Sequence, residues 1–387
     1  MTEENNLTML FSRLRQKRAK FALHQQKKRI DLPLLGAVIL ACGLGLLFIF
    51  EASSVSAARD FGDKYHFFRD QALWFVLGLV AMTLISFFDY HRLYKLALPI
   101  IIVAIVLLMT VFIPGLGVKA LGAHRWLNLK FFIIQPAEAA KLALIIYLAA
   151  WFSYKERGRL LAFVILVGIV VGLVVAEPDL GTAVVICATA LILYFLSGAP
   201  LWHFLMLVPA VTLTILGLAV TSPYRLRRLL TFLNPTVDPL GASYHIRQIL
   251  LGLGSGGFWG LGLGKSRQKF EYLPEAMTDS IFAIIGEELG FLGSVVLIAI
   301  FLFIVFRGVR IALFAPDRFG QLLGFGISSW IGVQAIVNLG AMVAIFPLTG
   351  VPLPLISYGG SSLVVTLIGI GILLNISKQC LAQKQTR

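Results

Sequence analysis

Charged residues are scarce in this 387-residue chain, making up 13% of it, whereas hydrophobic residues make up 58%. Cysteine is scarcer still. Cys42, Cys187 and Cys380 form an odd set without paired spacing, which indicates neither a disulfide framework nor a zinc site. A chain with so little charge and a mean hydropathy of +0.89 carries more apolar surface than one soluble core could bury. These shortages exclude a soluble domain and predict an all-α, polytopic membrane protein.

Ten stretches are apolar over roughly the 17 to 25 residues that a helix needs to cross a bilayer. They lie near residues 32–50, 71–88, 96–114, 136–152, 160–176, 183–198, 203–221, 279–306, 320–345 and 361–377. The sequence therefore predicts about ten transmembrane helices in one membrane domain, residues 32–377.

The net charge of +14 comes largely from the chain ends and the short loops, a pattern of membrane topology rather than of nucleic-acid binding. The stretch SRLRQKRAKFALHQQKKR precedes the first apolar window, which is too long for the apolar core of a signal peptide. We therefore expect a basic cytoplasmic tail (1–31), an uncleaved first helix, a cytoplasmic C-terminal tail (378–387) and one large extracytoplasmic loop (222–278).

The predicted loop 222–278 is unusually basic for an external segment. Its cations include Arg225, Arg227, Arg228, Arg247, Lys265, Arg267 and Lys269. Long loops escape the positive-inside rule, so these charges do not contradict the topology. Either they only solvate the loop, or they attract an anionic substrate or a phosphate head group, which is the interpretation we favour.

Two glycine-rich strings in this loop resemble nucleotide-binding motifs. GLGSGG (252–257) has no preceding strand, and in GLGLGKS (260–266) the first glycine of a phosphate-binding loop would fall on Trp259. Neither string predicts a nucleotide site. The glycines instead predict tight turns and close backbone packing in a re-entrant or interfacial loop.

Ionisable residues in or beside membrane spans are costly, and each is a candidate functional residue. Glu138 and Lys141 lie three residues apart in QPAEAAK and are expected to pair on one helix face, as a structural pair or a substrate contact. Arg125, next to Trp126, is either an interfacial anchor or a phosphate clamp. Glu177 and Asp179 lie in AEPDLGTA. Either they belong to a plain turn between helices, or they are buried carboxylates that need a cationic partner.

A last group of carboxylates lies in YLPEAMTDSIFAIIGEELG (272–290). If a helix ran through Asp279, Glu287 would lie about 80° around it from Asp279 and Glu288 would lie nearly opposite. We therefore expect Glu287 to share a cleft with Asp279 and Glu288 to pair with a neighbouring helix. The spacing of Gly286 and Gly290 predicts a close helix contact at the same depth.

These motifs together resemble the FtsW/RodA (SEDS) family over residues 32 to 377. The resemblance is carried by HRWLNL, QPAEAAK, EPDLGTA, NPTVDPLGASYHIRQ, GLGLGKSRQKFEYLPEAMTDSIFAIIGEELG and PLPLISYGGSS. LGKSRQKFEYLPEA, IIGEELG and the long basic N-terminal arm favour the division branch, FtsW. DPLGASYHIRQ and LTGVPLPLISYGG are also similar to the elongation branch, RodA.

The resemblance implies a peptidoglycan glycosyltransferase that polymerises lipid II, an undecaprenyl-diphosphate-linked disaccharide peptide, at the outer face of the bacterial cytoplasmic membrane. It implies a class B penicillin-binding transpeptidase as partner, with other division or elongation proteins, and a place at the division septum. The family's essential aspartate, in its HTD signature, corresponds to Asp279. Met277 replaces the histidine of that signature, and Ser280 stands where phenylalanine is common.

Polymerisation needs a sugar hydroxyl to attack an anomeric carbon and expel a diphosphate, so one base and strong charge neutralisation suffice. We predict Asp279 as the base, and Arg125, Lys265 and Lys269 as diphosphate ligands. The Glu138–Lys141 pair and Asp179 are expected to shape the substrate cavity, with support from Glu287 and Glu177.

The sequence assigns no cofactor and no metal site, although a divalent magnesium or manganese ion could assist. The histidines are scattered without a shared helix face: His24, His66, His91, His124, His203 and His245. Two other functions stay open. A lipid II flippase requires a polar path to both membrane faces, and a scaffold would only recruit the transpeptidase.

Overall fold

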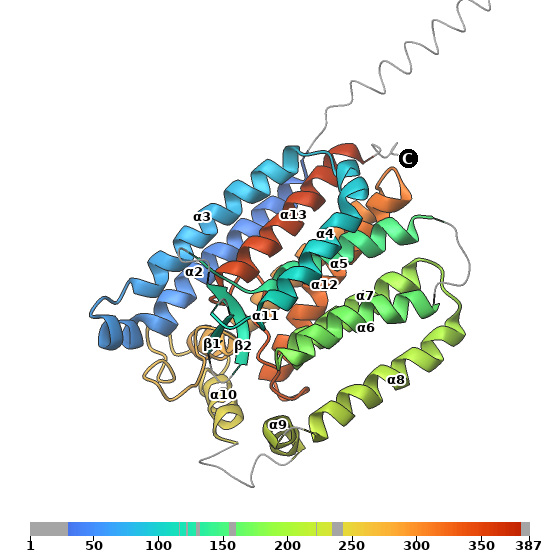
Figure 1. The fold of residues 1–387 in the computed structure, drawn as a ribbon. Helices are drawn as coiled ribbons and strands as arrows, with labels where there is room; N and C mark the ends of the chain where they lie inside the picture. Colours follow the sequence, from blue (N-terminus) through green and yellow to red (C-terminus); the bar gives the residue numbers. More distant parts are fainter. Residues whose placement is uncertain are drawn as a thin grey trace, which may run out of the picture.

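The computed structural model describes residues 30–115, 117–120, 123–128, 132–154, 160–221, 223–233 and 243–380. The predicted N-terminal tail therefore lies outside the described residues except for its last two positions, and the C-terminal tail except for its first three. The described chain folds as a bundle of long helices (Figure 1).

Every apolar window forms a helix. These helices are α2 (Leu32–Phe61), α3 (His66–Phe87), α4 (His91–Thr110), α5 (Pro136–Phe152), α6 (Leu160–Ala176), α7 (Leu180–Leu196), α8 (Leu201–Val220), α11 (Ile281–Leu313), α12 (Arg318–Met342) and α13 (Gly360–Gln379). Seven are long and apolar enough to cross a membrane by length and composition, and α5, α6 and α7 have 17 residues each. The predicted all-α polytopic membrane fold is confirmed.

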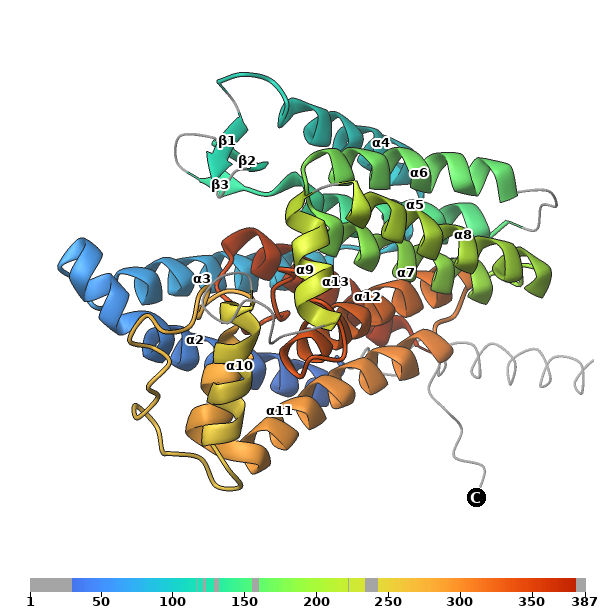
Figure 2. The same cartoon turned by 90° about the horizontal axis from the view of Figure 1, so that it is seen from below.

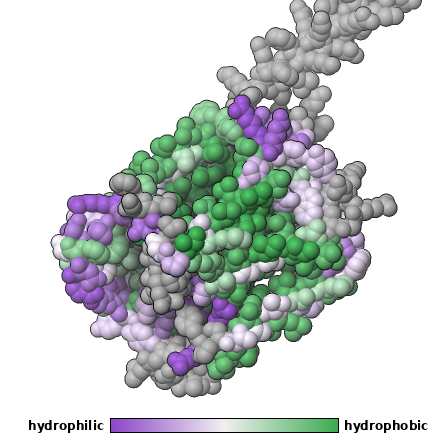
Figure 3. Space-filling model, in the orientation of Figure 1, coloured by the Kyte–Doolittle hydropathy of each residue, from purple (hydrophilic) through white to green (hydrophobic). Residues whose placement is uncertain are grey.

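Apolar side chains cover the outside of this bundle. Figure 3 shows a broad hydrophobic surface between two hydrophilic ends of the molecule. Along α3, the outward-facing Leu73, Val76, Val80 and Leu84 are each more than half exposed. Only 6% of the most apolar window of α8 is buried. An apolar surface of this extent is stable in lipid and not in water, which agrees with a membrane-spanning bundle.

Aspartates begin three of the long helices. Asp31, Asp179 and Asp317 are the N-caps of α2, α7 and α12, and each accepts a hydrogen bond from a backbone N–H in the first turn. An N-cap side chain satisfies a helical N–H that has no intrahelical partner, which matters most where water is excluded. Asp31 also pairs with Arg307 of α11 at 2.5 Å and so ties α2 to α11.

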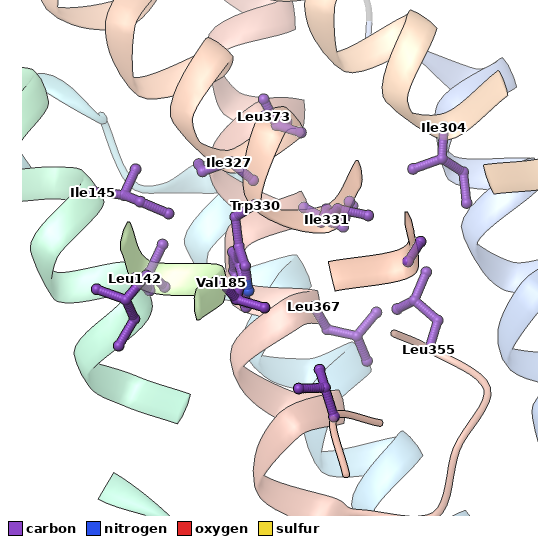
Figure 4. Close-up of a cluster of buried hydrophobic side chains, with 14 of the residues drawn as sticks. Leu142, Ile145, Val185, Ile304, Ile327, Trp330, Ile331, Leu355, Leu367 and Leu373 are labelled. Atoms are coloured by element: carbon purple, nitrogen blue, oxygen red, sulfur yellow. The ribbon is translucent and has the colours of Figure 1, made fainter. Parts of the chain in front are cut away.

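The centre of the bundle is a close-packed apolar core on α12. Trp330 is 1% exposed and lies among side chains from several helices, including Leu142 and Ile145 of α5 and Val185 of α7 (Figure 4). The core therefore joins the helices of the first half of the chain to those of the second half.

Three features of the loops were not predicted. A small antiparallel sheet of order β1-β2-β3 follows α4, formed by Gly117–Ala120, Ala123–Asn128 and Ile133–Ile134. The predicted loop 222–278 holds two helices, α9 (Pro223–Leu233) and α10 (Tyr244–Ser255). The sheet, α9 and α10 lie at the end of the bundle opposite the C-terminus, as Figures 1 and 2 show. We call this the loop end.

Helix α11 is broken at Gly290, which has φ 68° and ψ −163°. The segment 257–262 runs beside the break and supplies the missing hydrogen bonds. The N–H groups of Phe291 and Leu292 donate to the oxygens of Gly257 and Phe258, while the oxygens of Glu287 and Glu288 accept from Leu261 and Gly262. Backbone groups at a break cannot stay unpaired where water is excluded, so this segment makes the break possible.

Glycines allow the segment to approach so closely. A Cβ atom on Gly256 would lie 2.0 Å from the oxygen of Gly286, and one on Gly260 would lie 2.1 Å from the oxygen of Glu288. Gly260 also has a φ of +82°, which side chains disfavour. The prediction of close backbone packing by these glycines is confirmed. Gly290 makes its close contact with this segment, whereas Gly286 packs against Leu253 of the loop helix α10.

We expect Gly260→Ala to destabilise the protein by about 3 kcal/mol, because it adds both a steric clash and backbone strain. Gly254→Ala is the matched control, since a Cβ there meets nothing within 4 Å and Gly254 lies inside α10. The measurement is thermal unfolding of both purified variants in the same detergent. Equal melting temperatures for the two variants would contradict the proposed steric role of Gly260.

Candidate functional site

Asp279 lies in a tight turn just before α11, at the loop end. The N–H groups of Thr278 and Ser280 both donate to the oxygen of Glu275 at 3.2 Å and close the turn. The Nδ2 of Asn338, on α12, donates at 2.8 Å to the backbone oxygen of Asp279 and also to that of Val351. This turn is therefore held by α12 and by the segment before α13.

The carboxylate of Asp279 is 7% exposed, and the Oγ1 of Thr278 lies 3.4 Å from its Oδ1. A Cβ on Gly350 would lie 3.9 Å from Oδ2 of Asp279 and 3.8 Å from the guanidinium of Arg228 on α9, so glycine keeps a gap beside both groups. Burial raises the pKa of Asp279 to about 6; the charge of Glu275 adds to this shift and that of Arg228 opposes it.

The expected helical relation between Asp279 and Glu287 is wrong. Helix α11 begins at Ile281, with Ser280 as its N-cap, so Asp279 is not on the helix. The carboxylate of Glu287 instead points to the end of α10 and the loop that follows it, where its partners are Ser255 Oγ, Ser266 Oγ, Arg267 N and Gln268 N. It holds this loop on α11.

Glu288 and Lys269 belong to a second cluster beside that loop. The Nζ of Lys269 lies 3.2 Å from Glu51 of α2, 2.6 Å from the oxygen of Gly264 and 4.0 Å from Glu288. Lys269 is 9% exposed and its ammonium already has these protein partners, while its role as a diphosphate ligand stays a prediction. Lys265, in contrast, is exposed and available to an external anion. The expectation that Glu288 pairs with a neighbouring helix is wrong, because its partners are the N–H of Ser266 and the Nζ of Lys269, both in this loop.

The predicted pair of Glu138 and Lys141 is present and fully buried on α5. The Nζ of Lys141 lies 2.8 Å from Glu138 Oε1 and 2.7 Å from Gln334 Oε1 on α12, and above the ring of Trp330. A small, mostly apolar cavity adjoins Lys141. The pair therefore links α5 to the central core, and its charges are matched inside the bundle.

Arg125 of β2 contacts the turn between α6 and α7. Its guanidinium donates to the backbone oxygens of Glu177, at 3.1 Å, and Pro178, at 2.5 Å. Neither carboxylate oxygen of Glu177 has a hydrogen-bond partner among the described residues, and its side chain is 0% exposed. Burial, with the nearby charge of Asp179, raises the pKa of Glu177 to about 8, and Arg125 opposes the shift. Arg125 thus anchors the sheet to the bundle.

Asp179 caps α7. It accepts hydrogen bonds from the N–H of Thr182, at 3.0 Å, and from its hydroxyl, at 2.9 Å, and Gln135 lies 3.3 Å away. These contacts account for its conformation without a substrate.

Sequence reasoning missed the residues that surround Asp279 from other elements. Asn338 and His245 carry no charge pattern that marks them, and Arg228 was one of seven loop cations. Met277 packs against the core, and its backbone oxygen accepts from the N–H of Tyr358. Within the described residues, no group of three histidine, cysteine or acidic side chains is arranged to hold a metal ion.

These features define a polytopic membrane protein with a buried aspartate at the loop end of its bundle. The family model FtsW/RodA/SpoVE, described as a cell cycle protein, matches residues 32–381. The chain therefore belongs to the FtsW/RodA/SpoVE family.

Relatives match along nearly their whole length. The chain is 40% identical to the stage V sporulation protein E of Bacillus subtilis, over 91% of this chain and 98% of that protein. It is 41% identical to a probable peptidoglycan glycosyltransferase FtsW of Geobacter metallireducens, over 90% of this chain and 95% of that protein.

Solved structures share the fold. The rod shape determining protein RodA of Thermus thermophilus aligns with a TM-score of 0.68 at 29% identity, covering 92% of this chain and 98% of that one. A chain from a study of the structural coordination of polymerization and crosslinking by a peptidoglycan synthase complex aligns with a TM-score of 0.75 at 30% identity, covering 90% and 98%.

We expect Lys141→Met to destabilise the protein by about 3 to 5 kcal/mol, because it leaves Glu138 buried without its cation. The double variant Glu138→Gln, Lys141→Met removes both charges and is expected to recover most of this loss. Thermal unfolding in one detergent compares the two. A double variant as unstable as the single one would show that the ion pair is not the stabilising interaction.

Proposed function

We propose that this chain is a peptidoglycan glycosyltransferase that polymerises lipid II, with Asp279 as the general base. The observation that carries the proposal is the buried carboxylate of Asp279, which lies beside Arg228. The pKa of this carboxylate is raised to about 6. Relatives about 40% identical are named probable peptidoglycan glycosyltransferases, which supports the same activity.

The chemistry fits one carboxylate. A hydroxyl of one disaccharide attacks the anomeric carbon of another, the base takes the hydroxyl proton, and the diphosphate leaves with the electron pair of the broken bond. A diphosphate needs no protonation to leave, so no second carboxylic acid is required. With a pKa near 6, Asp279 is still ionised at pH 7 and is a stronger base than an ordinary aspartate.

Cations at the loop end are the proposed diphosphate ligands. Lys265 is exposed, and Arg228 lies close to the Asp279 carboxylate. Arg125 and Lys269 donate to protein oxygens, so we assign them to the walls of the site instead. Arg228 also donates to the backbone oxygen of Leu348, at 3.0 Å, and is kept as a ligand because of its position beside Asp279. Fixed positive charge stabilises the negative charge that develops on the leaving group.

We assign supporting roles to the remaining candidates. Glu138, Lys141 and Asp179 fix the helices that shape the cavity, and Glu287 holds the loop that carries Lys265. Glu177 supports the turn that Arg125 contacts.

We further propose that the chain acts at the division septum with both termini in the cytoplasm, so that segment 222–278 faces the outside. A class B penicillin-binding transpeptidase is the proposed partner. A structural neighbour from a study of coordinated polymerization and crosslinking supports this pairing.

Asp279→Asn tests the base directly, since it keeps the side-chain volume and removes the proton acceptor. We expect loss of glycan formation by at least about 100-fold, the lower range for a general base, with lipid II binding retained. The assay is polymerisation of lipid II by the purified protein with its transpeptidase. Asp63→Asn, at an exposed turn of the same end, is the control and should polymerise normally. Substantial glycan from Asp279→Asn would refute the base, and lipid II scrambling by the same preparation would favour the flippase.

The pH dependence of kcat/KM follows from the raised pKa of Asp279. The base works only when ionised, so kcat/KM should fall as the pH drops through about 6 and level off above it. The charged and titratable groups around this turn are Glu275, Arg228 and His245. Glu275→Gln removes a nearby negative charge, lowers the pKa of Asp279 and should move the acid limb to lower pH. An acid limb that stays in place would exclude Asp279 as the titrating group.

A further inference from the structure

We infer that His245 is a positioning residue for Asp279, because its imidazole joins the two ends of the turn that carries the carboxylate. This inference rests on the proposed function of Asp279. No role was expected for His245 from the sequence.

His245 lies in the first turn of α10 and reaches the Asp279 turn from the side. Its Nε2 is 2.7 Å from the Oγ of Ser280, which is 0% exposed and directly follows Asp279. The same imidazole makes a hydrogen bond with the backbone of Pro274. One side chain therefore contacts both ends of the segment 274–280.

The protonation of His245 is set by its surroundings. Burial lowers its pKa to about 4, and the charge of Arg228 contributes, so the imidazole is neutral at pH 7 and carries one N–H. A carbonyl oxygen only accepts, so the ring donates to Pro274. Because Nε2 faces Ser280, we assign Nδ1 as the donor to Pro274 and Nε2 as the acceptor from the Ser280 hydroxyl.

The turn depends on such outside contacts. Its own closing hydrogen bonds to Glu275 are 3.2 Å long, and the contact between the Thr278 hydroxyl and the Asp279 carboxylate is 3.4 Å long. The backbone thus decides where the carboxylate points. Asn338 holds the Asp279 oxygen from one side, and His245 holds Ser280 from the other.

His245 is itself rigidly placed. Helix α10 ends at Ser255, directly before Gly256, whose close approach to Gly286 locks α10 against the first part of α11. The imidazole and the turn it holds therefore belong to the same packed unit. Small displacements of a catalytic group cost large factors in rate, so a bond that fixes this turn acts on kcat.

The test is a set of variants in the full chain with its transpeptidase, assayed by steady-state polymerisation of lipid II. His245→Asn keeps a donor near Nδ1, and His245→Gln keeps a polar atom near Nε2. Each is expected to lower kcat about fivefold, the loss of one hydrogen bond, whereas His245→Ala should lower it about 20-fold or more. KM for lipid II should stay the same.

Two further measurements separate positioning from folding. Ser280→Ala should lower kcat about fivefold, and combined with His245→Ala it should add nothing, since both remove the same bond. In His245→Ala the acid limb of the pH profile should move to lower pH, because a loosened turn admits water to the Asp279 carboxylate. His203→Ala is the control: it loses an equally short contact, 2.7 Å to the hydroxyl of Tyr194, and should keep its kcat.

Normal kcat and an unshifted pH profile in His245→Asn, His245→Gln and Ser280→Ala would overturn the inference, as would a change confined to KM. Asp279→Asn is measured in the same series. If it still polymerises, the proposed function fails. If it is inactive while the His245 and Ser280 variants behave as the parent, the positioning role alone fails.

Discussion

The backbone contact at the Gly290 break is the interaction on which the loop end depends. A transmembrane helix cannot be interrupted unless other groups replace its hydrogen bonds, and the segment 257–262 does so. The same contact brings Glu287 and Glu288 against the loop that carries Lys265 and Lys269. It also fixes α10, so the position of the Asp279 turn follows from a contact made some ten residues further along α11.

Buried charges in this protein divide into two kinds. Lys141 and Lys269 each have carboxylate and neutral oxygen partners; Lys141 joins α5 to α12, and Lys269 joins its loop to α2. Asp279 and Glu177 have raised pKa values instead, because the effect of burial outweighs the opposing charge of Arg228 or Arg125. A group of the second kind costs stability and is suited to proton transfer, which is why the site chemistry is assigned to Asp279 rather than to the paired residues.

The sequence predicts the bundle well and the site less well. Ten apolar windows identify ten helices, because a bilayer demands long apolar runs. The spacing of Glu138 and Lys141 predicts their pairing, since both lie within one helix. The Asp279–Glu287 relation fails because helical geometry was extended past the start at Ile281, although Ser280 is a residue type favoured at N-caps. His245 and Ser280, 35 residues apart, meet only through the packing of α10 on α11, which a single sequence does not encode in any local pattern.

The general base that we propose at the membrane surface meets two opposing demands. Burial makes the Asp279 carboxylate more basic, but a diphosphate substrate requires cations nearby, and each cation lowers that basicity. Among the cations, Arg228 opposes the pKa shift of Asp279, whereas Lys265 is exposed on the segment between α10 and α11 and Lys269 pairs with Glu51. The Asp279 carboxylate keeps its raised basicity only if its turn does not move. The neutral contacts of Asn338 and His245 are therefore better suited to hold the turn than charged contacts would be.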